Sequence, residues 1–182
     1  MATDKDIIVA LEFGSSAIRG IAGNRLPDGS LEILALEHEK TGSDTILRGV
    51  IFNIDKTTQA INNIISRMNQ KLGRTIVRAY VSIGGQSLRT EKNFINRGLE
   101  AMVKVTPEIV DTLMDSNRST QYPDSVILEA LVQEYFLAGR TVTDPVGIQC
   151  NILEAHFINV IACQVLKANL EQCMKMAGIE IL

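Results

Sequence analysis

The chain has 182 residues, of which 46% are hydrophobic and 21% charged, a composition typical of a globular protein with one large domain or two small ones. Its net charge of −3, without a basic stripe interleaved with aromatic residues, argues against nucleic-acid binding. The apolar runs are too short to span a membrane.

The cysteines and the start of the chain indicate a cellular compartment. The three cysteines form no C-x-x-C pair, and an odd number without such a pair is typical of reduced thiols. The polar, acidic start lacks the basic and then apolar pattern of a secretory signal. We therefore expect a cytoplasmic protein. His38 and His156 have no partner at a metal-ligand spacing, so a zinc site is not expected.

An apolar strand predicted over residues 7–13 leads into a Gly-Ser-Ser turn and a second strand. Gly14 would let a ligand approach the backbone, and the hydroxyls of Ser15 and Ser16 would add to a donor surface for phosphate oxygens. Glu12, at the end of the strand, could hold the hydrated Mg²⁺ that accompanies a nucleotide. An ordinary hairpin has the same pattern, so both interpretations stay open here.

The next elements extend a sheet and cover it. A Pro-Asp-Gly turn precedes a third strand over residues 31–37, which predicts an antiparallel meander with the first strand central and buried on both faces. Apolar residues recur at three- and four-residue steps over 55–72, which predicts an amphipathic helix on the sheet, ended by Gly73. Another strand is predicted over 75–83.

A second compact unit is predicted after Gly84 and Gly85. Its expected order is strand, helix, strand and strand, over residues 94–105, 106–119, 125–137 and 147–162. The chain then continues as a helix over 165–177 and begins a strand at 179–182.

The strand over 125–137 shows a clear alternation. Its apolar positions, which predict one buried face, are Val126, Leu128, Ala130 and Val132. Glu129, Gln133 and Tyr135 are then expected on or near the opposite face. We expect an exposed charge such as Glu129 to serve binding and not folding.

With this order of elements, the sequence resembles the actin-like ATPases and, within them, the bacterial FtsA family, over nearly its whole length. Residues 12–16 are similar to the first phosphate motif of actin-like ATPases, and residues 48–57 to the stretch that opens the first long helix in FtsA. Two runs are more specific: Val-Gln-Glu-Tyr-Phe-Leu-Ala-Gly at 132–139 and Asp-Pro-Val-Gly-Ile at 144–148 are similar to runs of the FtsA-specific subdomain.

The resemblance implies an α/β (α+β) fold. An actin-like, ribonuclease-H-like subdomain 1A would carry an inserted strand-helix-strand-strand (SHS2) subdomain 1C. The expected boundaries are 1–83 for the first part of subdomain 1A, 84–161 for subdomain 1C and 162–182 for the return to subdomain 1A.

The resemblance also implies a nucleotide site in the full-length protein. ATP phosphates would contact Gly14, Ser15 and Ser16, Mg²⁺ would be held at Glu12, and Arg19 would replace a phosphate-binding lysine. An ordinary salt-bridged strand residue is the open alternative for Arg19. No catalytic residue is assigned, and the expected activity is at most a slow ATPase in the full-length protein.

Several parts of that family lie beyond Leu182, including the second phosphate motif and the adenosine pocket. Ser82-Ile83-Gly84-Gly85 imitates that motif without its aspartate and is interpreted as a strand end. We therefore expect an amino-terminal fragment that binds ATP weakly or not at all. Apolar surface left open at the helix over 165–177 and the strand over 179–182 predicts self-association.

The function implied is that of a cell-division protein. It would polymerise at the inner face of the cell membrane, anchor the FtsZ ring and recruit later divisome proteins through subdomain 1C. FtsZ and the membrane would be contacted by regions absent from this chain. The alternatives are a PilM-like pilus-assembly protein and half of a sugar or acetate kinase. The two specific runs favour FtsA, and the sequence offers no general base or substrate pocket for a kinase.

Overall fold

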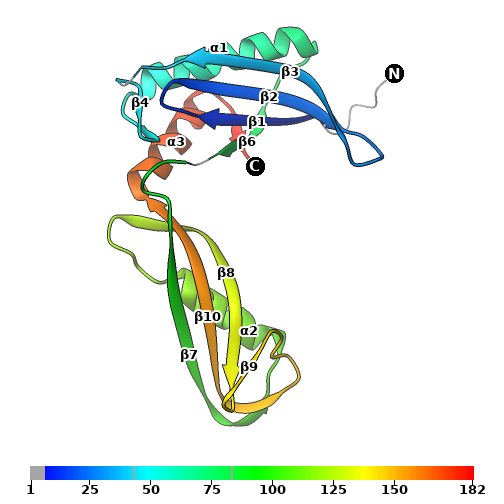
Figure 1. Ribbon diagram of the computed structural model, residues 1–182, viewed down its shortest axis with the longest axis vertical. Coiled ribbons are helices and arrows are strands. Elements are labelled where there is room, and N and C mark those ends of the chain that lie inside the picture. The colour runs from blue at the N-terminus through cyan, green and yellow to red at the C-terminus, as the bar shows by residue number, and fades with distance from the viewer. Residues whose placement is uncertain (1–6, 43, 83) are drawn as a thin grey trace. The chain divides into compact units, whose positions relative to one another are not determined.

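The computed structural model describes residues 7–42, 44–82 and 84–182, which form two compact units (Figure 1). Unit 1 comprises the chain up to Gln86 and from Val165 onward, and unit 2 comprises Ser87–Gln164. Residues 1–6, on which the expectation about a secretory signal depends, and Ile83, the predicted end of a strand, lie outside the described residues.

Unit 1 contains a five-stranded sheet in the order β11-β6-β1-β2-β3. Its strands are β1 Ile7–Phe13, β2 Ala17–Arg25, β3 Leu31–Lys40, β6 Arg78–Ser82 and β11 Glu180–Ile181, and a separate short hairpin is formed by β4 Ile46–Leu47 and β5 Val50–Ile51. The predicted antiparallel meander of β1, β2 and β3 is confirmed, and β1 is the central strand. β6 and β11 add to it in parallel.

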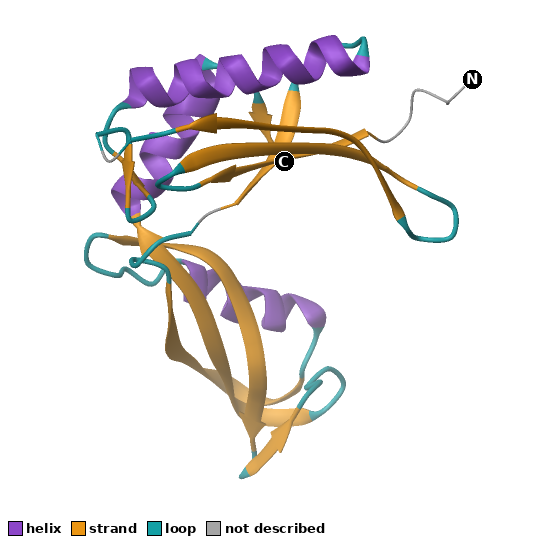
Figure 2. Ribbon diagram, turned by 45° about the horizontal axis from the view of Figure 1, so that its top comes forward, coloured by secondary structure: helices purple, strands orange, loops and turns teal. Residues whose placement is uncertain are grey.

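Two helices complete unit 1, α1 Ile54–Leu72 and α3 Gln164–Met176. The side chain of Asn53 caps α1 by accepting a hydrogen bond from the N–H of Lys56, and Gly73 ends the helix at a φ of 65°. α1 lies along the sheet (Figure 2). The approach is so close that a Cβ at Gly20 would stand 2.7 Å from a methyl carbon of Ile64.

Two expectations about unit 1 were wrong. β1 is buried on one face only: Leu11 is 1% exposed, whereas Ile8 is 40% exposed, because the described helices cover a single face of the sheet. The apolar side of α3 is also not free for self-association. Its residues Leu170 and Met174 pack into the core of unit 1, and Asn169 of α3 donates to the carbonyl of Ile51.

β6 begins later than predicted. The expected strand started at residue 75, but the backbone N–H of Ile76 donates to the side chain of Asn69 at 2.8 Å, and sheet pairing begins near Arg78. A side-chain acceptor on α1 thus competes with the sheet for this segment.

Unit 2 contains an antiparallel sheet in the order β7-β10-β8-β9 with α2 packed against it. Its elements are β7 Arg89–Lys104, α2 Pro107–Arg118, β8 Ser125–Leu137, β9 Arg140–Val142 and β10 Gln149–Cys163. β7 begins before the predicted residue 94, because an edge strand with one solvent-facing side accepts the polar run that precedes Phe94. β8 has the predicted bounds.

The predicted position of Tyr135 was wrong. Tyr135 is 7% exposed and belongs to the core of unit 2. The pairing of β8 with β10 shifts between His156 and Phe157, so that Gln133 is an extra residue and the alternation reverses after it. Burial raises the pKa of the Tyr135 hydroxyl.

A buried amide network ties the end of α2 to the sheet of unit 2. Asn117 and Asn159 are fully buried, and each side chain donates to the other, at 2.7 and 3.0 Å. Asn93 also donates to Asn117, and Asn159 donates to the hydroxyl of Tyr122. Because buried polar groups are costly without partners, this network fixes one position of α2 on the sheet.

Candidate functional site

The predicted phosphate-binding segment is the turn between β1 and β2. The N–H of Gly14 donates to the carbonyl of Ala17 at 3.0 Å, so the segment is indeed a tight hairpin turn. A Cβ at Gly14 would stand 2.8 Å from that carbonyl oxygen, which explains the glycine. Ser15 and Ser16 are exposed, and among the described residues neither hydroxyl has a hydrogen-bond partner. The turn therefore presents unused hydroxyl donors.

Thr41 is a contributor that the sequence analysis missed. Its hydroxyl donates to the carbonyl of Gly14 at 3.0 Å, and its N–H donates to the carbonyl of Ser16 at 3.0 Å. The predicted third strand ended at residue 37, whereas β3 continues to Lys40 and pairs Lys40 with Ala17. Had the predicted strand extended to Lys40, it would have placed Thr41 beside the turn.

Glu12 and Arg19 face each other across β1 and β2. A guanidinium N–H of Arg19 donates to Oε2 of Glu12 at 2.8 Å, and the two side chains are 51% and 53% exposed. In this structure Arg19 is therefore a salt-bridged strand residue. Exposed ion pairs of this kind contribute only ~0–1 kcal/mol, so a ligand could separate these side chains at little cost.

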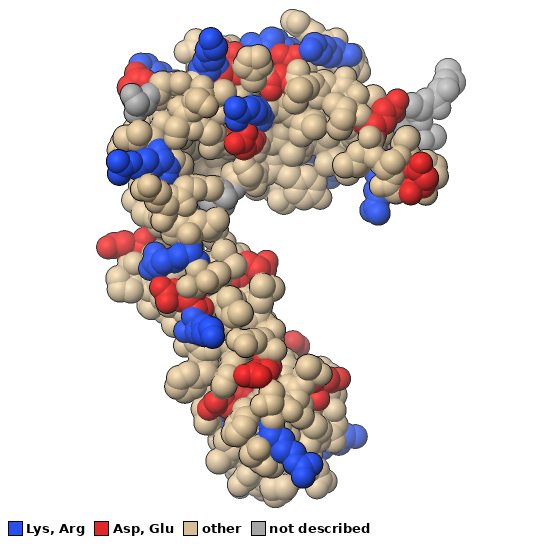
Figure 3. Space-filling model, in the orientation of Figure 1, with Lys and Arg blue, Asp and Glu red and all other residues tan. Residues whose placement is uncertain are grey.

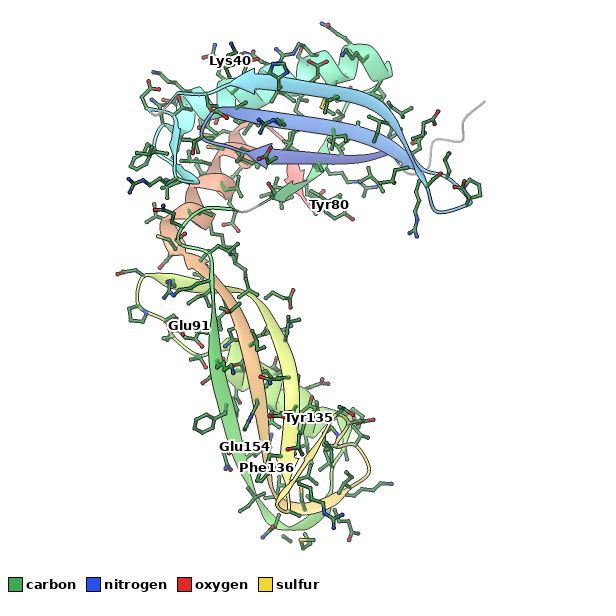
Figure 4. All side chains as sticks on the ribbon, in the orientation of Figure 1. Lys40, Tyr80, Glu91, Tyr135, Phe136 and Glu154 are labelled. Carbon is green, nitrogen blue, oxygen red and sulfur yellow. The ribbon has the colours of Figure 1, made fainter. Side chains whose placement is uncertain are left out.

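An open cavity of about 440 Å³ lies on the uncovered face of the unit 1 sheet and includes Glu12 and Arg19. The remainder of its lining is mostly apolar, with Ile21, Leu36 and Tyr80 among the exposed side chains. Tyr80 projects from β6 on the side of the sheet away from α1 (Figure 4). The cavity thus combines one ion pair with an apolar wall, and Tyr80 was not predicted as part of it.

The segment that imitates a second phosphate motif has another role. Gly85 adopts a φ of 124°, and a Cβ at Gly49 would stand 2.3 Å from the carbonyl oxygen of Gly84. Two backbone segments, at 48–49 and 84–85, therefore touch with no room for side chains. This close packing agrees with a strand end and gives the glycines a structural reason.

The open face of unit 2 is the side of its sheet away from α2. We call it the outer face, formed by Phe94, Leu131, Glu134, Phe136, Ile152, Glu154 and His156. Phe94 is 65% exposed and lies against the His156 ring with 6.4 Å between ring centroids. His156 contacts a glutamate on either side, Glu154 at 2.6 Å and Glu134 at 3.3 Å. Figure 4 shows Glu154 and Phe136 on neighbouring strands.

The described residues build no cluster suited to a metal ion, and charges of both signs share the face of the molecule seen in Figure 3. In the described part of the chain, no group of three or more His, Cys, Asp or Glu side chains is placed to hold a metal ion. Acidic and basic side chains are interspersed on the visible surface (Figure 3). Within the described ranges, no helix is both long and apolar enough to cross a membrane.

The family comparison concerns unit 2. The family model for the SHS2 domain inserted in FtsA matches residues 84–161. This range lies between the end of β6 and the start of α3, where the chain leaves unit 1 and later returns to it.

Curated relatives align with nearly the whole chain. Cell division protein FtsA of Pseudomonas aeruginosa is 29% identical over 96% of this chain and 42% of its own length. The proteins of the same name from Porphyromonas gingivalis and Bacillus subtilis are 25% and 24% identical, over 93% and 98% of this chain. The chain spans 36% to 42% of the length of these three relatives.

A solved structure shares the fold. The PilM-PilN type IV pilus biogenesis complex aligns with 98% of this chain and 46% of its own chain, at a TM-score of 0.59 and 13% identity. At that identity the likeness concerns the fold alone. The fold is actin-like with an inserted SHS2 domain, as the sequence predicted.

Proposed function

We propose that this chain, which is similar to cell division protein FtsA over nearly its whole length and matches the model of the SHS2 domain inserted in FtsA, is the amino-terminal part of a polymerising, ATP-binding cell-division protein. The main support for this proposal is the position of the SHS2 match at 84–161, because the chain leaves an actin-like unit before it and re-enters that unit after it. Because the chain spans well under half of its relatives, the activity belongs to the full-length protein.

Nucleotide binding would use the β1–β2 turn. Ser15 and Ser16 would donate to phosphate oxygens, with Gly14 keeping the turn tight. Glu12 would hold hydrated Mg²⁺, and Arg19 would turn from Glu12 to a phosphate. The exposed Glu12–Arg19 ion pair contributes little energy, so Mg²⁺ and phosphate could each replace one of its partners. These residues bind and orient the nucleotide, and none of them is assigned a chemical step.

Unit 2 would act as a contact surface without chemistry of its own. Its ten acidic residues outnumber its six basic ones, giving a net charge of −4, whereas the rest of the chain has a net charge of +1. The outer face adds exposed apolar side chains, with Phe94 65% and Leu131 53% exposed. Exposed apolar groups beside acidic ones suit contacts with other filament subunits and with later divisome proteins that carry basic residues.

The remaining partners would be met outside this chain. FtsZ and the membrane would be contacted by regions of the full-length protein that follow these residues in its relatives. The protein would lie in the cytoplasm, peripheral to the inner face of the membrane at the division site.

The test is the behaviour of the full-length protein in the organism that encodes it. We expect a fluorescent fusion to collect at the division site only while an FtsZ ring is present, and depletion to give long cells without septa. Normal division with loss of pili would favour the PilM-like alternative. Phosphorylation of acetate or a sugar by the purified full-length protein would favour the kinase alternative. Either result would overturn the proposal.

A further inference from the structure

The two long edges of the unit 2 sheet are built differently. β8 forms one edge, where β9 covers only Tyr135–Leu137. β7 forms the other edge and has no strand beyond it among the described residues (Figure 1). An uncovered edge exposes backbone N–H and C=O groups and is a template for pairing with another strand.

The β8 edge is protected. Its pairing with β10 shifts twice, which leaves Leu128 and Gln133 as extra residues that bend and twist the strand. The carboxylate of Glu129 also accepts a hydrogen bond from the backbone N–H of Ala130 at 3.1 Å. Bulges and charged side chains that occupy edge donors are the usual means of preventing edge pairing.

The β7 edge carries charged side chains, Lys92 among them, but between Arg89 and Gly98 it has no bulge that would bend it away from a second strand. Its pairing with β10 runs through this whole stretch without a register shift. In the middle stands Phe94, 65% exposed, which is a large apolar surface for a strand edge. A straight edge with a central aromatic residue is suited to adding a strand.

Arg97, on the same edge, has an unused donor. Its guanidinium Nη1 is buried, and no described residue accepts a hydrogen bond from it. Glu91 lies on the same face of β7 as Arg97, since both pair with α2-facing residues of β10, Asn159 and Leu153. Figure 4 shows Glu91 on this outermost strand.

We propose that β7 pairs antiparallel with β7 of a second copy, about a two-fold axis at Phe94, so that the two sheets become one. In this register Phe94 faces Phe94 of the second copy, and a residue that precedes Phe94 faces the residue that follows it by the same number of positions. Glu91 of each copy therefore lies opposite Arg97 of the other, once on each side of the axis. A residue facing its own symmetry mate is allowed in an antiparallel pair.

The charges select this register over its neighbours. Moving the axis to Asn93 would place Arg89 opposite Arg97, a like-charge pair, and moving it to Ile95 would place Arg97 opposite Asn93. Of these three axes, only the one at Phe94 places a carboxylate opposite each Arg97, which is half-buried, and directly opposed charges of opposite sign stabilise a strand pair. Glu91 now pairs with Arg89, at 3.0 Å, on an exposed surface that leaves it free to accept from a second arginine.

This inference rests on the proposed function, which includes self-association of the protein. It names the surface through which copies of this chain meet, in a symmetric contact that closes after two copies. Recruitment to the division site is measured separately, so either can fail without the other.

The experiment is sedimentation of the whole chain from about 1 µM to about 1 mM, comparing the wild type with E91R and R97E. Each single variant places like charges opposite each other at both ends of the strand pair, and we expect self-association about tenfold weaker. The matched controls D111R and R118E change charge by the same amount on α2, and we expect them to associate as the wild type does. Thermal unfolding verifies that each variant is folded.

An equimolar mixture of E91R and R97E gives the decisive result. Arg at position 91 then meets Glu at position 97 of the other variant, and the native Arg97 of one meets the native Glu91 of the other. We expect the mixture to associate as strongly as the wild type, within about threefold, which misfolding of either variant would prevent. In an oxidising buffer, F94C should also form a disulfide-linked dimer, and F136C, away from the edge, should not.

A wild-type chain that stays monomeric throughout would overturn the inference. So would single variants that associate like the wild type, or a mixture that fails to associate although both variants are folded. Wild-type dimers unaffected by these substitutions would place the contact on another surface.

Discussion

The two units of this protein each pack a helix on one face of a sheet, yet they fix that helix by opposite means. In unit 1, Arg67 and Lys71 of α1 pair with Glu37 of β3 at the solvent boundary, at 2.8 and 2.5 Å. In unit 2, the end of α2 is held by the fully buried pair of Asn117 and Asn159. The basic side chains that hold α1 are thus open to water, at 38% exposed for Arg67 and 56% for Lys71, whereas the amide pair that holds α2 is closed to it.

The difference has an energetic meaning. Exposed ion pairs contribute little and are lost gradually, whereas a buried amide deprived of its partner costs ~1–3 kcal/mol. Unit 2 also has the smaller apolar core, so its single position of α2 depends more on correct polar geometry. Because unit 2 has its own apolar core and its own buried amide network, we expect it to fold as a separate unit.

The largest effect is expected in the core of unit 2. Phe157 is 1% exposed, and F157A should lower the free energy of unfolding of unit 2 by about 3–5 kcal/mol, because it leaves a cavity that the sheet and α2 cannot close. Urea unfolding followed by hydrogen exchange of the β8 and β10 amides measures this. The matched control F136A, at a side chain that is 42% exposed, should cost under about 1 kcal/mol. Equal effects of the two would contradict the assignment of the core.

The buried amides come next. N159A should cost about 2 kcal/mol, because it leaves the side chains of Asn117 and Tyr122 without one of their partners. The double variant N117A/N159A should cost less than the sum of the singles, since it removes both halves of the pair. N96A, at an exposed residue bonded to Glu154, is the control. Additive losses would show that the two amides are not coupled.

A smaller effect is expected at the charged contacts of unit 1. Arg67 donates to Glu37, Glu39 and the carbonyl of His38, all at 2.7 to 2.8 Å, and R67M should lower the melting temperature by about 3 °C. Hydrogen bonds from Lys71 and Arg67 lower the pKa of Glu37, and a hydrogen bond from Arg67 lowers that of Glu39.

These lowered pKa values fix the sign of the pH dependence. The contribution of the contacts is complete above the pKa of an unfolded glutamate, about 4.3, and is lost as the pH falls through the lower pKa of the folded state. The melting temperature of R67M should therefore depend less on pH below about 4 than that of the wild type. Parallel acid profiles for the two proteins would contradict this account.

The smallest effect on folding is expected at the β1–β2 turn. E12Q and S16A should change the free energy of unfolding by no more than about 0.5 kcal/mol, because both side chains are exposed. This chain alone should bind Mg²⁺-ATP weakly or not at all, since a partial set of contacts must still offset the full cost of association. Isothermal titration checks this, and micromolar binding by residues 1–182 would refute it.

Local signals predicted most of the fold. The helix predicted over 55–72, ended by Gly73, matches α1 to within one residue, and the strand predicted over 125–137 has the bounds of β8. The misses involve long-range partners. The reversal at Tyr135 depends on how β10 pairs with Gln133, and the late start of β6 depends on a hydrogen bond from Ile76 to Asn69. Neither partner is visible from local pattern.

The candidate site divides in the same way. Glu12 and Gly14 were found because strand, acid and glycine are adjacent in sequence. Thr41 and Tyr80 were missed because they reach the site through strand register and through a parallel strand far along the chain. Ser15 and Ser16 as phosphate contacts remain a prediction.

The most direct test of the central claim, that unit 2 is a contact surface on an actin-like scaffold, is division-site recruitment by the full-length protein carrying E129K. Glu129 is exposed and caps only the N–H of Ala130, so the melting temperature should stay within about 2 °C of the wild type. We predict that recruitment of later division proteins, measured by fluorescence at the division site, falls at least several-fold. Intact recruitment and polymerisation after deletion of the whole of unit 2 would contradict the claim and reduce the insertion to a spacer.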